Sequence, residues 1–175
     1  MSDATRRPSR RALFKLGVGS ALALAVVGGG AWLWRPGLSS GRLTPTGRSV
    51  FRAVARAVLE GSLPPDVAAR ERALDAHMVQ LDVVIDGLSP ATRSDLDQML
   101  ALLSVAPVRV WLTGLASDWD QAALQEVQAA LRQMRADPQP LRQQTYHALR
   151  DLNNAAFFAR PEHWPLLGYP GPTPV

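Results

Sequence analysis

Residues 66–88, DVAARERALDAHMVQLDVVIDGL, carry the pattern that decides the fold class. Large apolar residues recur in this stretch at alternating steps of four and three, at Leu74, Met78, Leu81, Ile85 and Leu88. This spacing places them on one face of an α-helix, which buries that face against other elements. Asp66 stands in the position of a helix N-cap, and Gly87 stands where a helix ends. We therefore expect one helix between these two residues.

Apolar residues recur with helical spacing on both sides of this stretch. We expect four further helices, over Val50–Leu59, from Ser89-Pro90, from an N-cap at Asp118, and over Leu141–Phe158. The short apolar segment 108–115 fits a helix or a strand by its periodicity, and its helical surroundings favour a helix. The sequence thus predicts an all-α domain over residues 48–159, a small bundle of about five helices.

Charged residues along the predicted helices have the spacing of exposed faces. Arg48, Arg52 and Arg56 line one side of the first helix, and Asp75, Asp82 and Asp86 fall off the apolar stripe of the second. Both rows are typical of solvated helix surfaces. We therefore expect no acid–base chemistry from these carboxylates.

The basic excess of the chain lies in its N-terminal part. The chain carries a formal net charge of +4, with 19 Lys and Arg against 15 Asp and Glu. Residues 1–35 hold six of the basic residues and one acid, which leaves 13 basic and 14 acidic residues in the remainder. Because the body is close to neutral, we expect no nucleic-acid partner. The absence of cysteine excludes disulfides and thiolate metal sites.

A motif of a different kind lies in residues 9–15, which read SRRALFK. It resembles the twin-arginine export signal, S-R-R-x-F-L-K, because Ser9, Arg10, Arg11 and Lys15 match. Leu13 and Phe14 occupy the two apolar places in swapped order. Such signals are addresses read by a receptor. The resemblance implies a protein exported in the folded state by the twin-arginine translocase to the periplasm.

An uncharged run of 19 residues, 16–34, follows this motif. A helix of that length spans roughly 28 Å at about 1.5 Å per residue, which is just enough to cross the inner membrane. An ordinary single-pass helix with basic flanks is therefore the alternative to an export signal. Ala23-Leu24-Ala25 has the small-x-small form of a cleavage site, but it lies in mid-run. Removal of residues 1–34 and their retention as an anchor both remain open.

Two segments lack helical periodicity. Residues 35–47, RPGLSSGRLTPTG, are dominated by Pro, Gly, Ser and Thr, so we expect a linker there. Residues 160–175 combine several prolines and glycines with two aromatic residues. We expect this tail to be extended rather than helical. Because it is too apolar for a disordered end, it should lie against its own domain or against another chain.

The sequence shows no recognisable catalytic or cofactor site. His77, His147 and His163 fall in different predicted elements, without the spacing of metal ligands. Nucleotide-binding and hydrolase motifs are also missing. Trp111, Trp119 and Trp164 are typical of a core or an interface. We therefore predict a protein that is not an enzyme and that holds neither a metal nor a cofactor.

Taken together, these features resemble the small, non-catalytic subunit of membrane-associated flavoprotein dehydrogenases of the glucose–methanol–choline type. The family is that of gluconate 2-dehydrogenase subunit 3, in the broad sense. The resemblance rests on residues 9–15, 48–66 (RSVFRAVARAVLEGSLPPD), 146–164 (YHALRDLNNAAFFARPEHW) and 167–172 (LGYPGP). Residues 9–15 and the tail are its distinctive parts.

The resemblance implies a large FAD-dependent dehydrogenase subunit as the partner, with FAD bound only to that partner. This chain would bind the large subunit and escort it through twin-arginine export. The tail would supply the interface, at Trp164, Leu167, Gly168, Tyr169, Pro170, Gly171 and Pro172. The alternative is a stand-alone, membrane-tethered periplasmic module that binds a small apolar ligand between its helices. A metal or redox enzyme is a third possibility, which would need clustered histidines and acids.

Overall fold

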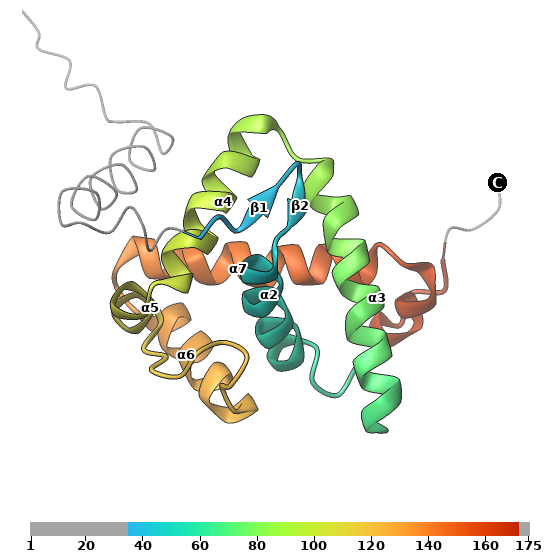
Figure 1. Ribbon diagram of the computed structural model, residues 1–175. Helices are drawn as coiled ribbons and strands as arrows, with labels where there is room; N and C mark the ends of the chain where they lie inside the picture. Colours follow the sequence, from blue (N-terminus) through green and yellow to red (C-terminus); the bar gives the residue numbers. More distant parts are fainter. Residues whose placement is uncertain (1–34, 172–175) are drawn as a thin grey trace, which may run out of the picture. The chain divides into compact units, whose positions relative to one another are not determined.

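The computed structural model describes residues 35–171, which fold into six α-helices, a two-stranded hairpin and one 3₁₀-helix (Figure 1). The all-α prediction is confirmed for this part of the chain. The strands are β1 (Leu38–Ser39) and β2 (Arg42–Leu43). The helices are α2 (Pro45–Val58), α3 (Val67–Asp86), α4 (Pro90–Ser104), α5 (Ala106–Thr113), α6 (Leu124–Ala136), α7 (Pro140–Phe158) and the 3₁₀-helix η2 (Pro161–Leu167).

Helix α2 is the central element of the bundle, and α3, α4, α6 and α7 all pack against it. Its buried side chains include Val50, Phe51, Val54 and Ala55, which are fully enclosed. A helix that is apolar on more than one face must be covered on more than one side. This is why α2 occupies the centre, with α7 crossing behind it in Figure 1.

The apolar stripe of α3 forms part of the same core. Leu74, Met78, Leu81 and Ile85 are buried, as their spacing predicts. The Asp66 carboxylate accepts a hydrogen bond from the backbone N–H of Ala69 at 2.8 Å, so Asp66 is the N-cap. The segment 108–115 lies largely within α5, so its helical interpretation is confirmed.

The segment 35–47 is not a linker. It contains the β1–β2 hairpin, whose turn is formed by Ser40 and Gly41 with positive φ angles of 50° and 77°. A two-residue turn of this kind matches the twist of paired strands. The segment also contains the first turn of α2, because Thr44 caps that helix by accepting from the Gly47 N–H at 3.2 Å. Helix α2 therefore begins before the predicted Val50.

Two carboxylates from distant helices hold the hairpin in place. Asp97 of α4 accepts a hydrogen bond from the Leu38 N–H at 2.7 Å, and Asp82 of α3 accepts one from the Leu43 N–H at 2.8 Å. Both bonds satisfy backbone donors at the edges of a very short sheet. Composition alone could not reveal them, because both partners lie far along the chain.

The charged rows of α2 and α3 face each other rather than solvent alone. Arg48 forms an ion pair with Asp82, and Arg52 contacts Glu71 and Asp75 at 2.5 and 2.6 Å. The expectation of purely solvated rows is therefore wrong for these residues. The ion pairs are partly exposed, so each contributes little stability but fixes the register of the two helices.

Asp118 does not cap a helix, because α6 begins only at Leu124. The carboxylate of Asp118 instead pairs at 2.8 Å with Arg109, a buried side chain of α5. Arg109 also donates to the carbonyls of Leu115 and Ala116 at 3.3 and 3.2 Å. A buried guanidinium requires such acceptors, and these bonds organise the loop between α5 and α6.

Candidate functional site

The C-terminal tail is folded, which corrects the expectation of an extended segment. Residues Pro161–Leu167 form the 3₁₀-helix η2. Pro161 occupies its first turn, where no backbone N–H is needed. Gly168 ends the helix with a φ of 70°, and its N–H donates to the Pro165 carbonyl at 3.0 Å. Short 3₁₀ turns tolerate prolines that would break a longer α-helix.

Two side chains of the tail bind the end of α7. The Nδ1 of His163 donates to the Phe157 carbonyl at 2.6 Å, and the Nε1 of Trp164 donates to the Phe158 carbonyl at 2.9 Å. These carbonyls belong to the last turn of α7, where regular helical donors run out, and the Phe157 carbonyl also accepts from the Arg160 N–H at 3.4 Å. The His163 ring also stacks on Phe157, with ring centroids 3.7 Å apart. The tail therefore caps α7 and is fixed by it.

Beyond these contacts, the tail presents apolar side chains to solvent. Leu166, Leu167 and Tyr169 are 57%, 61% and 47% exposed. Trp164 is half-buried and packs against Tyr169, with ring centroids 5.4 Å apart. Trp164 thus packs beneath the exposed side chains and contributes little of the exposed surface itself. We call Leu166, Leu167 and Tyr169 the tail patch.

The remaining residues of the predicted interface are distributed around this patch. Gly168 and Pro170 are exposed, and Gly171 lies against the Trp164 ring. Pro172 lies outside the described residues. Leu166 was missed by the sequence reasoning, although an apolar Leu166-Leu167 pair between Pro165 and Gly168 is a signal for an exposed turn.

A buried polar pair lies beneath the tail. His77 of α3 and Asn153 of α7 are both buried, and the His77 Nε2 lies 2.9 Å from the Asn153 Oδ1. The Asn153 amide nitrogen donates to the Leu149 carbonyl at 2.8 Å, so its oxygen is the acceptor and His77 carries the proton on Nε2. Burial lowers the pKa of His77, the hydrogen bond to Asn153 partly opposes this, and the neighbouring His163 and Arg160 lower the pKa further.

We expect acid to destabilise the fold through His77. In the unfolded chain its pKa is about 6.5, whereas the folded pKa is lower. The contribution of His77 to the free energy of unfolding is therefore fully present above about pH 6.5. It is lost as the pH drops from there to the folded pKa, because only the unfolded state gains the proton in this range. The measurement is the melting temperature of the wild type and of His77→Gln between pH 7.5 and 5. The amide of His77→Gln can still donate to Asn153 but does not titrate.

The two proteins differ only at position 77, so the comparison isolates His77. The melting temperature of His77→Gln should fall less over this range than that of the wild type. Equal losses in the two proteins would contradict the assignment.

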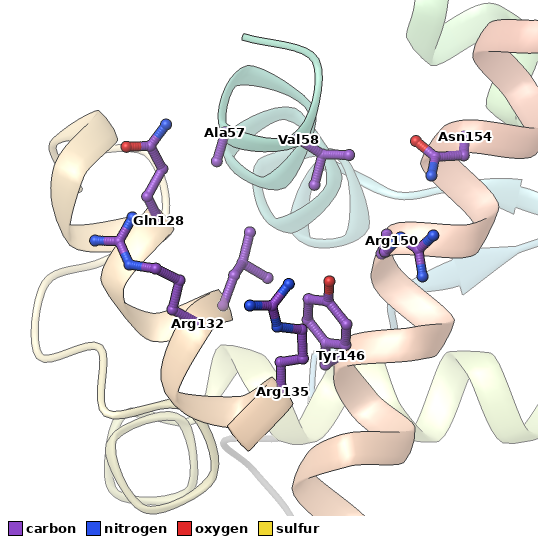
Figure 2. Close-up of a pocket in the computed structure, with 9 residues that line it drawn as sticks. Ala57, Val58, Gln128, Arg132, Arg135, Tyr146, Arg150 and Asn154 are labelled. Atoms are coloured by element: carbon purple, nitrogen blue, oxygen red, sulfur yellow. The ribbon is translucent and has the colours of Figure 1, made fainter. Parts of the chain in front are cut away.

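A second feature is a hollow of about 350 Å³ between α2, α6 and α7, shown in Figure 2. Arg132 and Arg135 of α6 and Arg150 of α7 line it, together with Tyr146. Its apolar wall consists of Ala57, Val58 and Leu131. We call this hollow the arginine pocket. The sequence reasoning missed it, because the three arginines come from two helices whose relative rotation the spacing does not give.

Within residues 35–171, no group of three or more His, Asp or Glu side chains could hold a metal ion. No single helix in this range is long and apolar enough to span a membrane, although α4 and α5 together have the required length and composition and are bent by 102° at their junction. The export-motif residues Ser9, Arg10, Arg11, Leu13, Phe14 and Lys15 lie outside the described residues, as does the run 16–34.

Comparison of the chain with protein-family models, curated proteins and solved structures gives no match.

Proposed function

We propose that this chain is a non-catalytic accessory subunit that binds a large FAD-dependent dehydrogenase and escorts it through twin-arginine export. Residues 16–34 would then hold the pair at the periplasmic side of the inner membrane. The proposal rests on the sequence resemblance of residues 9–15 and of the tail. The single structural observation that supports it is the tail patch.

The tail patch has the physical properties of a binding surface. Leu166, Leu167 and Tyr169 expose apolar area within four residues, and burial of such area stabilises a complex by about 25 cal/mol per Å². The patch is also pre-organised, because His163 and Trp164 fix η2 to α7. A surface that is already ordered loses little conformational entropy on binding. Tyrosine is enriched among the residues that dominate binding energy.

The alternative, a stand-alone module for a small apolar ligand, receives less support. The arginine pocket carries three guanidinium groups around a small apolar wall. Burying an apolar molecule there would desolvate charged groups without giving them partners. The arginine pocket therefore does not favour the ligand that this alternative requires.

We expect the double variant Leu166→Ser/Leu167→Ser to lose the flavoprotein. Both side chains are mostly exposed, so the substitutions should change the free energy of unfolding by less than about 1 kcal/mol. Removal of two central apolar contacts should lower the yield of co-purified flavoprotein by about tenfold or more. The measurement is flavin absorbance per mole of tagged full-length chain, purified from its native envelope.

The matched control is Val79→Ser/Val83→Ser, which changes two valines of α3 that are 62% and 61% exposed. This variant should retain the flavoprotein. An undiminished yield with the Leu166→Ser/Leu167→Ser variant would refute the assignment of the tail patch. Failure of the wild-type chain to co-purify any flavoprotein would refute the proposed function itself. Deletion of residues 160–175 is a poorer test, because it also uncovers the end of α7.

A further inference from the structure

We infer that the arginine pocket binds a small organic anion, a carboxylate or a phosphate monoester that carries an apolar group. This inference is independent of the proposed function. It rests on the charge, the hydrogen-bonding groups and the apolar wall of the arginine pocket.

The arginines of the arginine pocket differ from other described arginines in their ion pairs. Several arginines elsewhere in residues 35–171 contact a carboxylate on another turn or helix, namely Arg48, Arg52, Arg93, Arg109 and Arg142. Arg132 and Arg135 form no ion pair with a carboxylate in this part of the chain. Arg150 contacts only the neighbouring and largely exposed Asp151, at 3.4 Å. Two of the three arginines of the arginine pocket, Arg132 and Arg135, therefore have no carboxylate partner among the described residues.

Local helix electrostatics do not account for this arrangement. Arg135 lies in the last turn of α6, where a positive charge suits the negative end of the helix dipole. That effect fades within one turn and does not extend to Arg132. The two arginines are three residues apart on the same helix, so their like charges repel each other. An anion bound between them would attract both guanidinium groups and so offset their mutual repulsion.

The hydrogen-bonding groups of the arginine pocket are mostly donors. The guanidinium groups of Arg132, Arg135 and Arg150 are donors only, and their planar forks match the geometry of a carboxylate or a phosphate. Tyr146 and Asn154, from the same face of α7, add a hydroxyl and an amide. These groups lie around one open space in Figure 2. A ligand rich in acceptors is the complement of such a set.

The apolar wall and the volume of the arginine pocket suit a small molecule that carries an apolar group. Ala57 and Val58 of α2 and Leu131 of α6 form a surface next to the arginines. Gln128 also lines the arginine pocket and donates to the Glu60 carboxylate, which is not among the lining residues. A volume of about 350 Å³ suits a small molecule. The ligand would place its anionic group on the guanidinium groups and its apolar group on the aliphatic side chains.

The test uses the full-length chain in non-ionic detergent and phenyl phosphate as the probe, with binding measured by isothermal titration calorimetry. The wild type should bind phenyl phosphate more tightly than inorganic phosphate, and benzyl alcohol should not bind. The double variant Arg132→Gln/Arg135→Gln should bind phenyl phosphate at least about tenfold more weakly, because two charge-assisted hydrogen bonds are removed. The melting temperature of each protein shows whether it remains folded.

The matched control is Arg42→Gln/Arg72→Gln, which removes the same charge from two exposed arginines outside the arginine pocket. It should bind phenyl phosphate as the wild type does. Three results would overturn the inference: no binding to the wild type at millimolar probe, unchanged binding to the Arg132→Gln/Arg135→Gln variant, or equal weakening in the control. Equal binding of inorganic phosphate would overturn the role of the apolar wall.

Discussion

Substitution of Phe51 by alanine is expected to lower the free energy of unfolding by about 3–5 kcal/mol. Phe51 is fully buried in α2, the helix against which α3, α4, α6 and α7 pack. Removal of a buried phenyl ring loses its transfer free energy and leaves a cavity that the neighbouring helices cannot close. Because small domains are stable by only about 5–15 kcal/mol, this loss is a large part of the total. Urea unfolding followed by circular dichroism measures it.

Phe51→Leu is the graded control for this substitution. It retains most of the apolar volume, so the loss should be about 1–2 kcal/mol. The central role of α2 would be contradicted if Phe51→Ala cost less than about 1 kcal/mol, since only a site that collapses freely behaves in that way.

Substitution of Gly47 by alanine is the second change with a large expected effect. A Cβ atom at this position would lie 2.3 Å from the Gly37 carbonyl oxygen and 2.9 Å from the Leu43 Cδ2. The carbonyl belongs to the backbone and also accepts a hydrogen bond from the Thr44 N–H, so it cannot rotate away. The steric overlap should lower the free energy of unfolding by more than the gain of about 1 kcal/mol from the higher helix propensity of alanine. We expect a net loss of about 2–3 kcal/mol in the free energy of unfolding.

Gly87→Ala provides the comparison. Gly87 has a φ of −73°, and a Cβ there would come no closer than 3.5 Å to the Val84 carbonyl oxygen. Its free energy of unfolding should stay within about 0.5 kcal/mol of the wild-type value or rise slightly. Similar losses for the two variants in the same urea titration would show that close packing of the hairpin on α2 is not the cause.

The helices could be predicted from the sequence because their signals are local. The stripe of Leu74 to Ile85 and the cap at Asp66 both act within a few residues, and both are confirmed. The β1–β2 hairpin could not be predicted, because its backbone donors are satisfied by Asp82 and Asp97 from other helices. The misplaced start of α6 has a similar cause, since Asp118 serves a buried arginine instead of a helix N-terminus.

The candidate sites could be predicted only in part. The apolar character of the tail is visible in the sequence. The sequence does not show which of its apolar side chains pack against the bundle and which are exposed to solvent. Trp164 turns inward because the last carbonyls of α7 need a donor, and this leaves Leu166 and Leu167 exposed. The arginine pocket depends on how α6 and α7 are rotated against each other, which residue spacing along one helix does not specify.

The bonds from His163 and Trp164 to the end of α7 link the opening of the tail to fraying of that helix. If η2 detaches, the carbonyls of Phe157 and Phe158 lose these donors, so the two segments should open as one cooperative unit. A protein that binds Leu166 and Leu167 would therefore slow amide hydrogen exchange several residues upstream, in the last turn of α7, even though it does not contact that turn. Slower amide hydrogen exchange in the last turn of α7 would therefore show that a partner is bound to the tail patch.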